Sequence, residues 1–191
     1  NPQLTGYNDG IGTHVLFSNP TSIKISQSNQ FALLTDRSNQ AIRSIKLTYS
    51  PTLSPSTSPT LTPSSLPTLH YEVPVTTLLG SLSSLSGNSN GIGTNALCFG
   101  PSQVTLSFDG SFALFADYFN HQIRHVTITT NVVTTLIGSS LSGNSNGQGS
   151  NAQFTNPWGV TLSFDSSFAL ISDSNHLIRK LILTTNTLTS F

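Results

Sequence analysis

The stretch VTLSFDGSFALFAD, residues 104–117, returns as VTLSFDSSFALISD at residues 160–173, so that corresponding positions lie 56 residues apart. In both copies apolar and polar residues first alternate with a period of two, which is typical of a half-buried β-strand. A short apolar run, FALF or FALI, then follows. The pattern predicts two short consecutive strands, and Asp165-Ser-Ser is typical of the turn between them.

The repeat extends beyond this pair of segments. NHQIR at 120–124 returns as NHLIR at 175–179, and an earlier copy contains QFALLTD at 30–36 followed by NQAIR at 39–43. The chain therefore contains three copies of one unit.

Each copy predicts four short antiparallel strands. In the last copy, residues 177–183 and 187–191 are rich in β-branched and large apolar residues, and Thr184-Thr-Asn separates them. No stretch has a convincing helical periodicity. Four strands per repeat, at a period of roughly 40 to 55 residues, predict the blade of a β-propeller.

The first copy carries an insertion. Asp36 and Asp117 are 81 residues apart, 25 more than the period, and residues 49–72 contain prolines at 51, 55, 59, 63 and 67. A segment rich in Pro, Ser and Thr lacks the apolar side chains that form a core, so a flexible insertion between the third and fourth strands is expected.

These observations predict an all-β fold in which three four-stranded blades form an open arc, a partial propeller. The expected blades cover residues 1–79, 80–137 and 138–191. The first and last blades of an open arc need neighbours for their apolar faces, so we expect missing propeller blades from the same chain or from another copy. The chain contains no Met and is expected to be a fragment of a larger protein.

Several short motifs resemble the NHL repeat. They are Asn-Pro-x-Gly-Val at 156–160, Ser-Phe-Ala-Leu at 167–170, Asp173 followed by Asn-His-Leu-Ile-Arg at 175–179, and Val-Thr-Thr-Leu-Ile-Gly at 133–138. The sequence departs from the pattern at Gln40-Ala41 and at Gln122. The resemblance implies a propeller of about six blades, of which three copies are roughly half, and a binding or scaffolding role.

Composition excludes several classes of function. Seven Lys and Arg residues balance seven Asp and Glu residues, and the basic residues are not clustered, so a nucleic-acid surface is not expected. Cys98 is the only cysteine, which excludes an internal disulfide and a thiolate zinc cluster; a buried thiol is predicted instead. No apolar run is long enough for a membrane span.

Alternating strand direction predicts which loops share a face. The near-identical loops SLSGNSNGIG at 84–93 and SLSGNSNGQG at 140–149 fall on the same face as the turns between the second and third strands. The insertion falls on the opposite face. We refer below to the first of these as the loop-rich face.

Two sets of repeated residues on this face are expected to be structural. Asp36, Asp117 and Asp173 are predicted to accept hydrogen bonds from backbone amides of the turns that follow them. Gly91, Gly93, Gly147 and Gly149 are predicted to supply positive φ angles. The repeated arginines at 43, 124 and 179 predict a packing or ion-pair role, with the aspartates as partners.

Candidate binding residues on the same face are Trp158, Asn120, His121, Asn175, His176, Asn90 and Asn146. Trp158 breaks the symmetry most strongly, because Thr21 and Ser102 occupy its place in the other copies; packing on the rim is the alternative role. No catalytic residue, metal ligand or cofactor site is predicted, since the loops offer neutral Asn where calcium would need carboxylates.

The predicted function is a non-enzymatic module that binds or organises protein or glycan partners. The alternative is part of a metal-assisted propeller lyase or lactonase with ligands near the central channel. The Pro/Ser/Thr-rich segment resembles extracellular stalk sequence, which favours an extracellular or cell-surface location.

Overall fold

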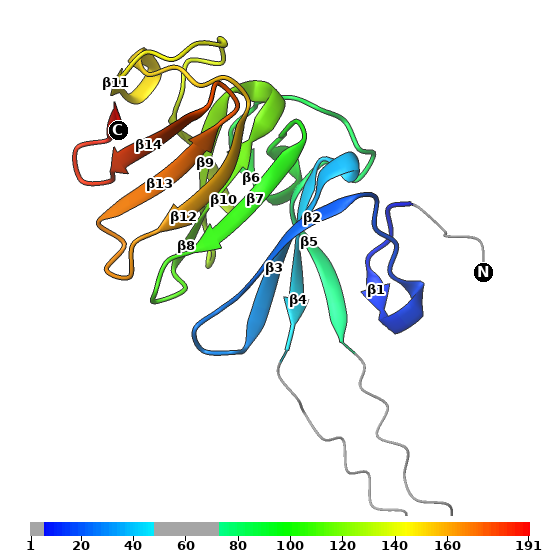
Figure 1. The fold of residues 1–191 in the computed structure, drawn as a ribbon. Coiled ribbons are helices and arrows are strands. Elements are labelled where there is room, and N and C mark those ends of the chain that lie inside the picture. The colour runs from blue at the N-terminus through cyan, green and yellow to red at the C-terminus, as the bar shows by residue number, and fades with distance from the viewer. Residues whose placement is uncertain (1–5, 48–72) are drawn as a thin grey trace, which may run out of the picture.

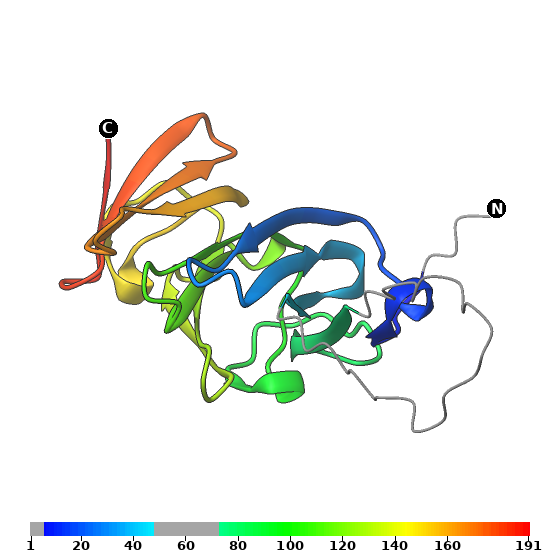
Figure 2. The same cartoon turned by 90° about the horizontal axis from the view of Figure 1, so that it is seen from below.

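The chain forms three antiparallel β-sheets that stand side by side in an open arc (Figure 1, Figure 2). The structure is a computed structural model that describes residues 6–47 and 73–191. The expected insertion at 49–72 lies outside the described residues. The all-β fold and the open arc of propeller-like sheets predicted from the repeat are confirmed.

Each sheet contains five strands, and the helices that lie between strands are short 3₁₀ helices. The first consists of β1 (Gly10–Ile11), η1 (Gly12–His14), β2 (Pro20–Ile25), β3 (Phe31–Asp36), η2 (Arg37–Asn39), β4 (Ala41–Lys46) and β5 (Pro74–Gly80). The second consists of β6 (Gly91–Ile92), η3 (Gly93–Asn95), β7 (Pro101–Leu106), β8 (Phe112–Asp117), η4 (Tyr118–Asn120), β9 (Gln122–Thr127) and β10 (Val132–Ile137). The third consists of β11 (Gly147–Gln148), η5 (Gly149–Asn151), β12 (Pro157–Leu162), β13 (Phe168–Asp173), β14 (Leu177–Ile182) and β15 (Thr187–Ser190).

The fifth strand of each sheet was not expected, because two residues are too few to produce a periodic pattern. In the second sheet β6 pairs with the outer strand β10, with Ile92 opposite Val132 and Gly91 opposite Val133. The repeated loop therefore ends as an edge strand of the sheet that follows it in the chain. β6 therefore pairs with the outermost long strand, β10, and the chain then continues through η3 to the innermost strand, β7.

The hydrophobic core lies between the sheets and follows the period of two. In β8, Ala113 and Phe115 pack in the cluster shared with the first sheet, whereas Leu114 and Ala116 pack in the cluster shared with the third. The middle sheet is thus apolar on both faces. Cys98 lies in the first cluster, where burial raises the pKa of its thiol well above the usual value, and its Sγ donates to the carbonyl of Gln40 at 3.0 Å.

The two outer faces of the arc carry exposed apolar side chains. Ile23 and Ile25 on β2 are 58% and 54% exposed, and Ile178 on β14 is 50% exposed. Val104 and Val160 are the counterparts of Ile23 in the second and third sheets. Both are buried in the clusters between sheets. The outer faces therefore resemble the inner ones but lack a covering sheet among the described residues.

Candidate functional site

A buried ion pair lies at the same place in every sheet, where the second long strand reaches the loop-rich face. The distance from the arginine Nη1 to the aspartate Oδ2 is 2.9 Å in the first two sheets and 3.4 Å in the third. The pairs are Asp36–Arg43, Asp117–Arg124 and Asp173–Arg179, and all six residues are buried. The repeated arginines thus have the ion-pair role that their spacing predicted.

The aspartates also hold the chain that enters the innermost strand. Asp117 Oδ1 accepts from the amide of Phe99 at 2.7 Å, two residues before β7. Asp36 and Asp173 accept in the same way from Ser18 and Thr155, both at 2.8 Å. These three backbone donors lie 18 residues earlier in the sequence, whereas the predicted donors were amides of the following turn. Burial raises the pKa of Asp117 to about 6, although Arg124 and its hydrogen-bond donors act in the opposite direction.

The duplicated loop covers the guanidinium of this pair. Arg124 Nη2 donates to the carbonyl of Ser89 at 3.1 Å and to Asn90 Oδ1 at 3.0 Å. Arg179 makes the equivalent bonds to Ser145 and Asn146, and in the first sheet Asp9 takes the place of the asparagine. Asn90 and Asn146, which the sequence suggested as binding residues, thus have intramolecular partners that explain why the loop repeats.

The loop glycines differ in what they contribute. Gly93 and Gly149 have φ values of 55° and 52°, as expected for the start of a 3₁₀ turn. Gly147 also has a positive φ, 157°, whereas Gly91 does not. At Gly91 the reason is space, since a Cβ would lie 3.1 Å from the backbone of Asn95 and Ala96.

The asparagines of the turns have unequal environments. Asn120 Nδ2 donates to Asp117 Oδ2 at 2.9 Å and to the carbonyl of Gly87 at 2.7 Å, which links the turn to the loop. In the third sheet the turn is one residue shorter, and both polar atoms of the Asn175 side chain are buried without a partner among the described residues. Asn120 is therefore structural, whereas the contacts assign no role to Asn175.

His121 joins two neighbouring sheets. Its Nδ1 accepts from the amide of Asn156 at 3.0 Å, just before β12, and Gln40 Oε1 accepts from the amide of Gly100 in the same way at 2.5 Å. Both residues have left-handed backbone, with φ values of 56° and 55°. His176 has φ 65° and is exposed on the outer side of the third sheet, where no further sheet is described.

This bond predicts a pH-dependent stability. Only a neutral imidazole can accept at Nδ1, and burial lowers the pKa of His121 below 6.5. The unfolded chain then binds more protons between the two pKa values, so the stabilisation is present above about pH 6.5 and is lost as the pH falls. His121→Gln, which copies Gln40, should keep the acceptor and reduce the loss of Tm between about pH 7.5 and pH 5. An unchanged pH slope would contradict this role; His125, whose pKa burial also lowers, is common to both proteins.

Trp158 lies in an irregular part of its strand and is half exposed. The pairing of β12 with β13 shifts between Pro157 and Gly159, which makes Trp158 the extra residue of a β-bulge. Bulges redirect side chains and often border functional sites. The indole is 48% exposed and meets the ring of Tyr118 edge-on, with 5.5 Å between centroids.

A cluster of aromatic rings around one cation surrounds Trp158. The guanidinium carbon of Arg37 lies 4.7 Å from the Trp158 ring centroid, 4.6 Å from that of Tyr118 and 5.5 Å from that of Phe119. Among the described residues no carboxylate lies within ion-pair distance of Arg37. We call these four residues the aromatic cluster; all three sheets contribute to it.

Sequence reasoning found Trp158 but missed its companions. Arg37, Tyr118 and Phe119 lie between the repeated aspartate and asparagine of their turns, at positions where the copies differ. That variation within an otherwise regular turn was the available signal. Their meeting requires the arc, because residues 37, 118 and 158 come from three different sheets.

Beside the aromatic cluster, small hydroxyl side chains form hydrogen bonds between the innermost strands of neighbouring sheets. Thr21 Oγ1 donates to the carbonyl of Ser102 at 2.7 Å, and Ser102 Oγ donates to the carbonyl of Trp158 at 2.7 Å. In the third sheet Trp158 occupies the equivalent position and has no hydroxyl. The series of donors therefore stops where the aromatic cluster begins.

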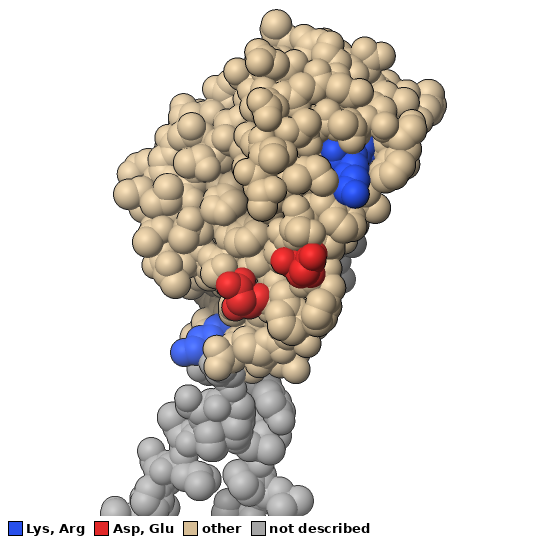
Figure 3. Space-filling model, turned by 90° about the vertical axis from the view of Figure 1, so that its left-hand side faces the viewer, with Lys and Arg blue, Asp and Glu red and all other residues tan. Residues whose placement is uncertain are grey.

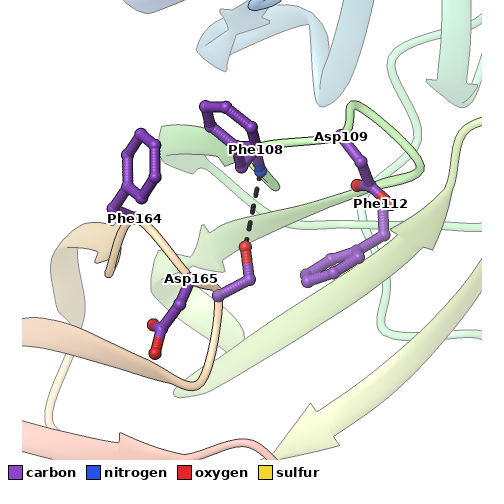
Figure 4. Close-up of a pocket in the computed structure, with 6 residues that line it drawn as sticks. Phe108, Asp109, Phe112, Phe164 and Asp165 are labelled. Atoms are coloured by element: carbon purple, nitrogen blue, oxygen red, sulfur yellow. Dashed lines mark hydrogen bonds between the residues drawn. The ribbon is translucent and has the colours of Figure 1, made fainter.

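A separate hollow of about 320 Å³ lies at the opposite ends of the strands from the loop-rich face. Figure 4 shows the residues that line it. It is formed by the turns after β7 and β12, and its lining consists of Phe108, Asp109, Phe112, Phe164, Asp165 and Ser166. We call it the turn pocket. The rings of Phe108 and Phe164 lie 4.3 Å apart between centroids, and the amide of Phe108 donates to Ser166 Oγ at 3.4 Å.

Within residues 6–47 and 73–191, no three His, Cys, Asp or Glu residues gather closely enough to hold a metal ion. The alternative metal-assisted enzyme thus gains no ligand set from these segments. None of the helices in the same segments is both long and apolar enough to cross a membrane.

The fold matches several solved structures, although no family model and no curated protein matches the sequence. An auxiliary nutrient binding protein from Bacteroides ovatus has 21% identity and a TM-score of 0.67, with 91% of this chain and 38% of that one covered. A protein of the same description from Bacteroides thetaiotaomicron has 21% identity and a TM-score of 0.65, with 88% and 36% covered. A nidogen/laminin complex has 13% identity and a TM-score of 0.59, with 93% and 49% covered. The chain thus shares a β-propeller type of fold with proteins of which it spans less than half.

Proposed function

We propose that this chain is part of a non-enzymatic NHL-type propeller that binds or organises protein or glycan partners through its loop-rich face. The observation that carries the proposal is the aromatic cluster. Trp158 and Phe119 are 48% and 45% exposed although they have large apolar rings. They come from the third and second sheets, and Arg37 of the first sheet packs against both. Exposed aromatic residues beside an arginine are typical of interaction sites.

The rest of the loop-rich face supports the cluster mechanically. The arginines of the buried ion pairs bind the duplicated loops, as Arg124 binds Asn90. His121 and Gln40 accept hydrogen bonds from amides of the next sheet. The turns that carry Arg37 and Tyr118 are therefore held both by their own sheet and by the neighbouring one. A prearranged surface loses less conformational entropy on binding. The description of two structural neighbours as nutrient binding proteins agrees with a binding role, and a location outside the cell or at its surface is proposed with it.

Further propeller blades are also proposed as partners, from the same protein or from a second copy. They would cover the exposed isoleucines of β2 and β14. His176 would then accept from an amide of the following blade as His121 does. The domain limits 1–79, 80–137 and 138–191 are kept as the proposed blades.

Trp158→Ala is expected to weaken binding by roughly tenfold or more, because truncation of a central aromatic anchor commonly has such an effect. Binding would be measured on an array of neutral and acidic oligosaccharides and by crosslinked capture of partner proteins. Phe191→Ala is the matched control, since Phe191 is an aromatic ring that lies outside the aromatic cluster and is 80% exposed. Equal loss in both variants, or full binding by Trp158→Ala, would reject the loop-rich face. Tight binding of single-stranded RNA with a steep dependence on salt would contradict the proposal that the partners are proteins or glycans.

A further inference from the structure

Arg37 differs from the other arginines of the chain in what it binds. Arg43, Arg124 and Arg179 each form an ion pair with a buried aspartate. The guanidinium of Arg37 has no carboxylate or other hydrogen-bond acceptor among the described residues, and its nitrogen atoms remain accessible to solvent. Within the part of the chain that the structure describes, Arg37 is thus the arginine whose donors are left for a ligand.

Aromatic rings hold this guanidinium in place. Its carbon lies 4.6 Å from the ring centroid of Tyr118 and 4.7 Å from that of Trp158. Stacking uses the face of a guanidinium and leaves its edge, which carries the N–H donors, free to bind a carboxylate. Elsewhere the same chain completes this arrangement: Arg179 lies 5.5 Å from the ring centroid of Phe154 while it binds the carboxylate of Asp173. The aromatic cluster offers the same arrangement without the carboxylate.

The rest of the aromatic cluster offers apolar surface and neutral donors. Phe99, which is 38% exposed, extends the aromatic surface, with its ring centroid 4.6 Å from that of Phe119. Tyr118 and Trp158 accept hydrogen bonds through their backbone carbonyls, but neither the Tyr118 hydroxyl nor the indole N–H has a partner among the described residues. A matching ligand therefore combines a carboxylate with apolar surface and with oxygen atoms that accept hydrogen bonds.

Charge is sparse on this protein, so an arginine without a counterion is a distinctive feature. The 191 residues include only seven Lys and Arg. On the side of the molecule shown in Figure 3, a few separate charged groups interrupt a surface that is otherwise uncharged. A polyanion of high charge density needs several clustered cations. A single arginine among aromatic rings fits instead a ligand that places one carboxylate beside its own apolar surface.

We propose that the aromatic cluster binds a uronic acid residue of an acidic glycan, with the sugar carboxylate on the guanidinium of Arg37 and the C–H face of the sugar ring on Trp158. This inference rests on the proposed function, because it names the ligand of the loop-rich face. A uronic acid carries its carboxylate directly on a rigid ring, so one sugar residue supplies both groups at a short separation, and its hydroxyl groups can accept from Tyr118. An acidic peptide would need an acidic and an apolar side chain, and would lose more conformational entropy when both are ordered.

The test is an NMR titration of the ¹⁵N-labelled chain with trigalacturonic acid and with its methyl ester, which keeps the sugar rings but removes the charge. Shifts are expected at residues 37–40, 118–121 and 156–159, and the ester should bind several-fold more weakly. Arg37→Met should lower the affinity for the acid roughly tenfold and leave the affinity for the ester nearly unchanged.

Lys180→Met is the matched control for the loss of charge. Lys180 Nζ lies 4.6 Å from the ring centroid of Phe168, so the variant also removes a cation stacked on a ring, but one outside the aromatic cluster. It should bind the acid and the ester as the unmodified chain does. A spectrum of unchanged dispersion for each variant confirms that the fold is intact.

The possible failures separate this inference from the proposed function. Equal binding of acid and ester that Trp158→Ala abolishes would overturn the uronic acid and keep the loop-rich face as the binding surface. Tighter binding of the peptide acetyl-Gly-Trp-Glu-Gly-amide than of trigalacturonic acid, with shifts at the same residues, would also overturn it and would favour an acidic protein partner. Shifts at other loops only, or spread over the whole chain, would overturn the inference and the binding face together.

Discussion

Arg124→Met is expected to lower the free energy of unfolding by about 3–5 kcal/mol, because it leaves Asp117 buried without its cation. The guanidinium also binds Leu97, Ser89 and Asn90, so the duplicated loop should lose its anchor at the same time. Chemical denaturation would measure the loss, and hydrogen exchange at residues 87–91 should become faster. Arg37→Met is the control: this arginine is partly exposed and is expected to change stability by about 1 kcal/mol or less.

The effect should depend on pH in a definite direction. Burial raises the pKa of Asp117 to about 6 in the folded chain, above 3.8, so the folded state holds a proton that the unfolded state releases in this window. The contribution of this group is therefore present at low pH and is lost as the pH rises. Without Arg124 the folded pKa should rise further, so the loss should be greatest above about pH 6 and smaller near pH 4. A loss below about 1 kcal/mol at neutral pH would contradict a central role for the pair.

Gly138→Ala is expected to cost about 3 kcal/mol, because both the backbone angle and the available space require glycine. Its φ is 116°, and a Cβ would lie 2.6 Å from the carbonyl oxygen of His121 and 3.0 Å from the Cα of Gln122. Neither atom can move without displacing the turn that carries His121 against the third sheet. The variant should therefore weaken the contact between sheets as well as its own strand.

Gly110→Ala is the matched control for this prediction. Gly110 also has a positive φ, 71°, but no atom lies within 4 Å of the position that a Cβ would take. It should cost only about 1 kcal/mol, from the backbone angle alone. Thermal unfolding of the two variants would compare them, and similar losses would show that the collision at Gly138 is relieved by a small shift.

The local repeat was enough to predict most of the strands. Alternation in residues 104–117 and 160–173 predicted paired strands correctly, because a period of two is a property of the strand itself. The two-residue strands such as β6 were missed, since their pairing with β10 depends on a partner about 40 residues away and not on their own pattern. Likewise, the bond between Asn90 and Arg124 depends on the packing of the loop against the sheet and cannot be read from the loop sequence alone.

The sequence by itself determined that this chain is a series of β-blades, because three copies of the same alternating pattern can bury their apolar faces only by stacking. It also identified Trp158 as a break in that series. Only the tertiary structure decided what surrounds Trp158: stacking brings Arg37, Tyr118 and Trp158 together from turns far apart in the chain, and it places Phe108 beside Phe164 on the opposite face. Contacts between separate sheets depend on their relative placement, which no local pattern encodes.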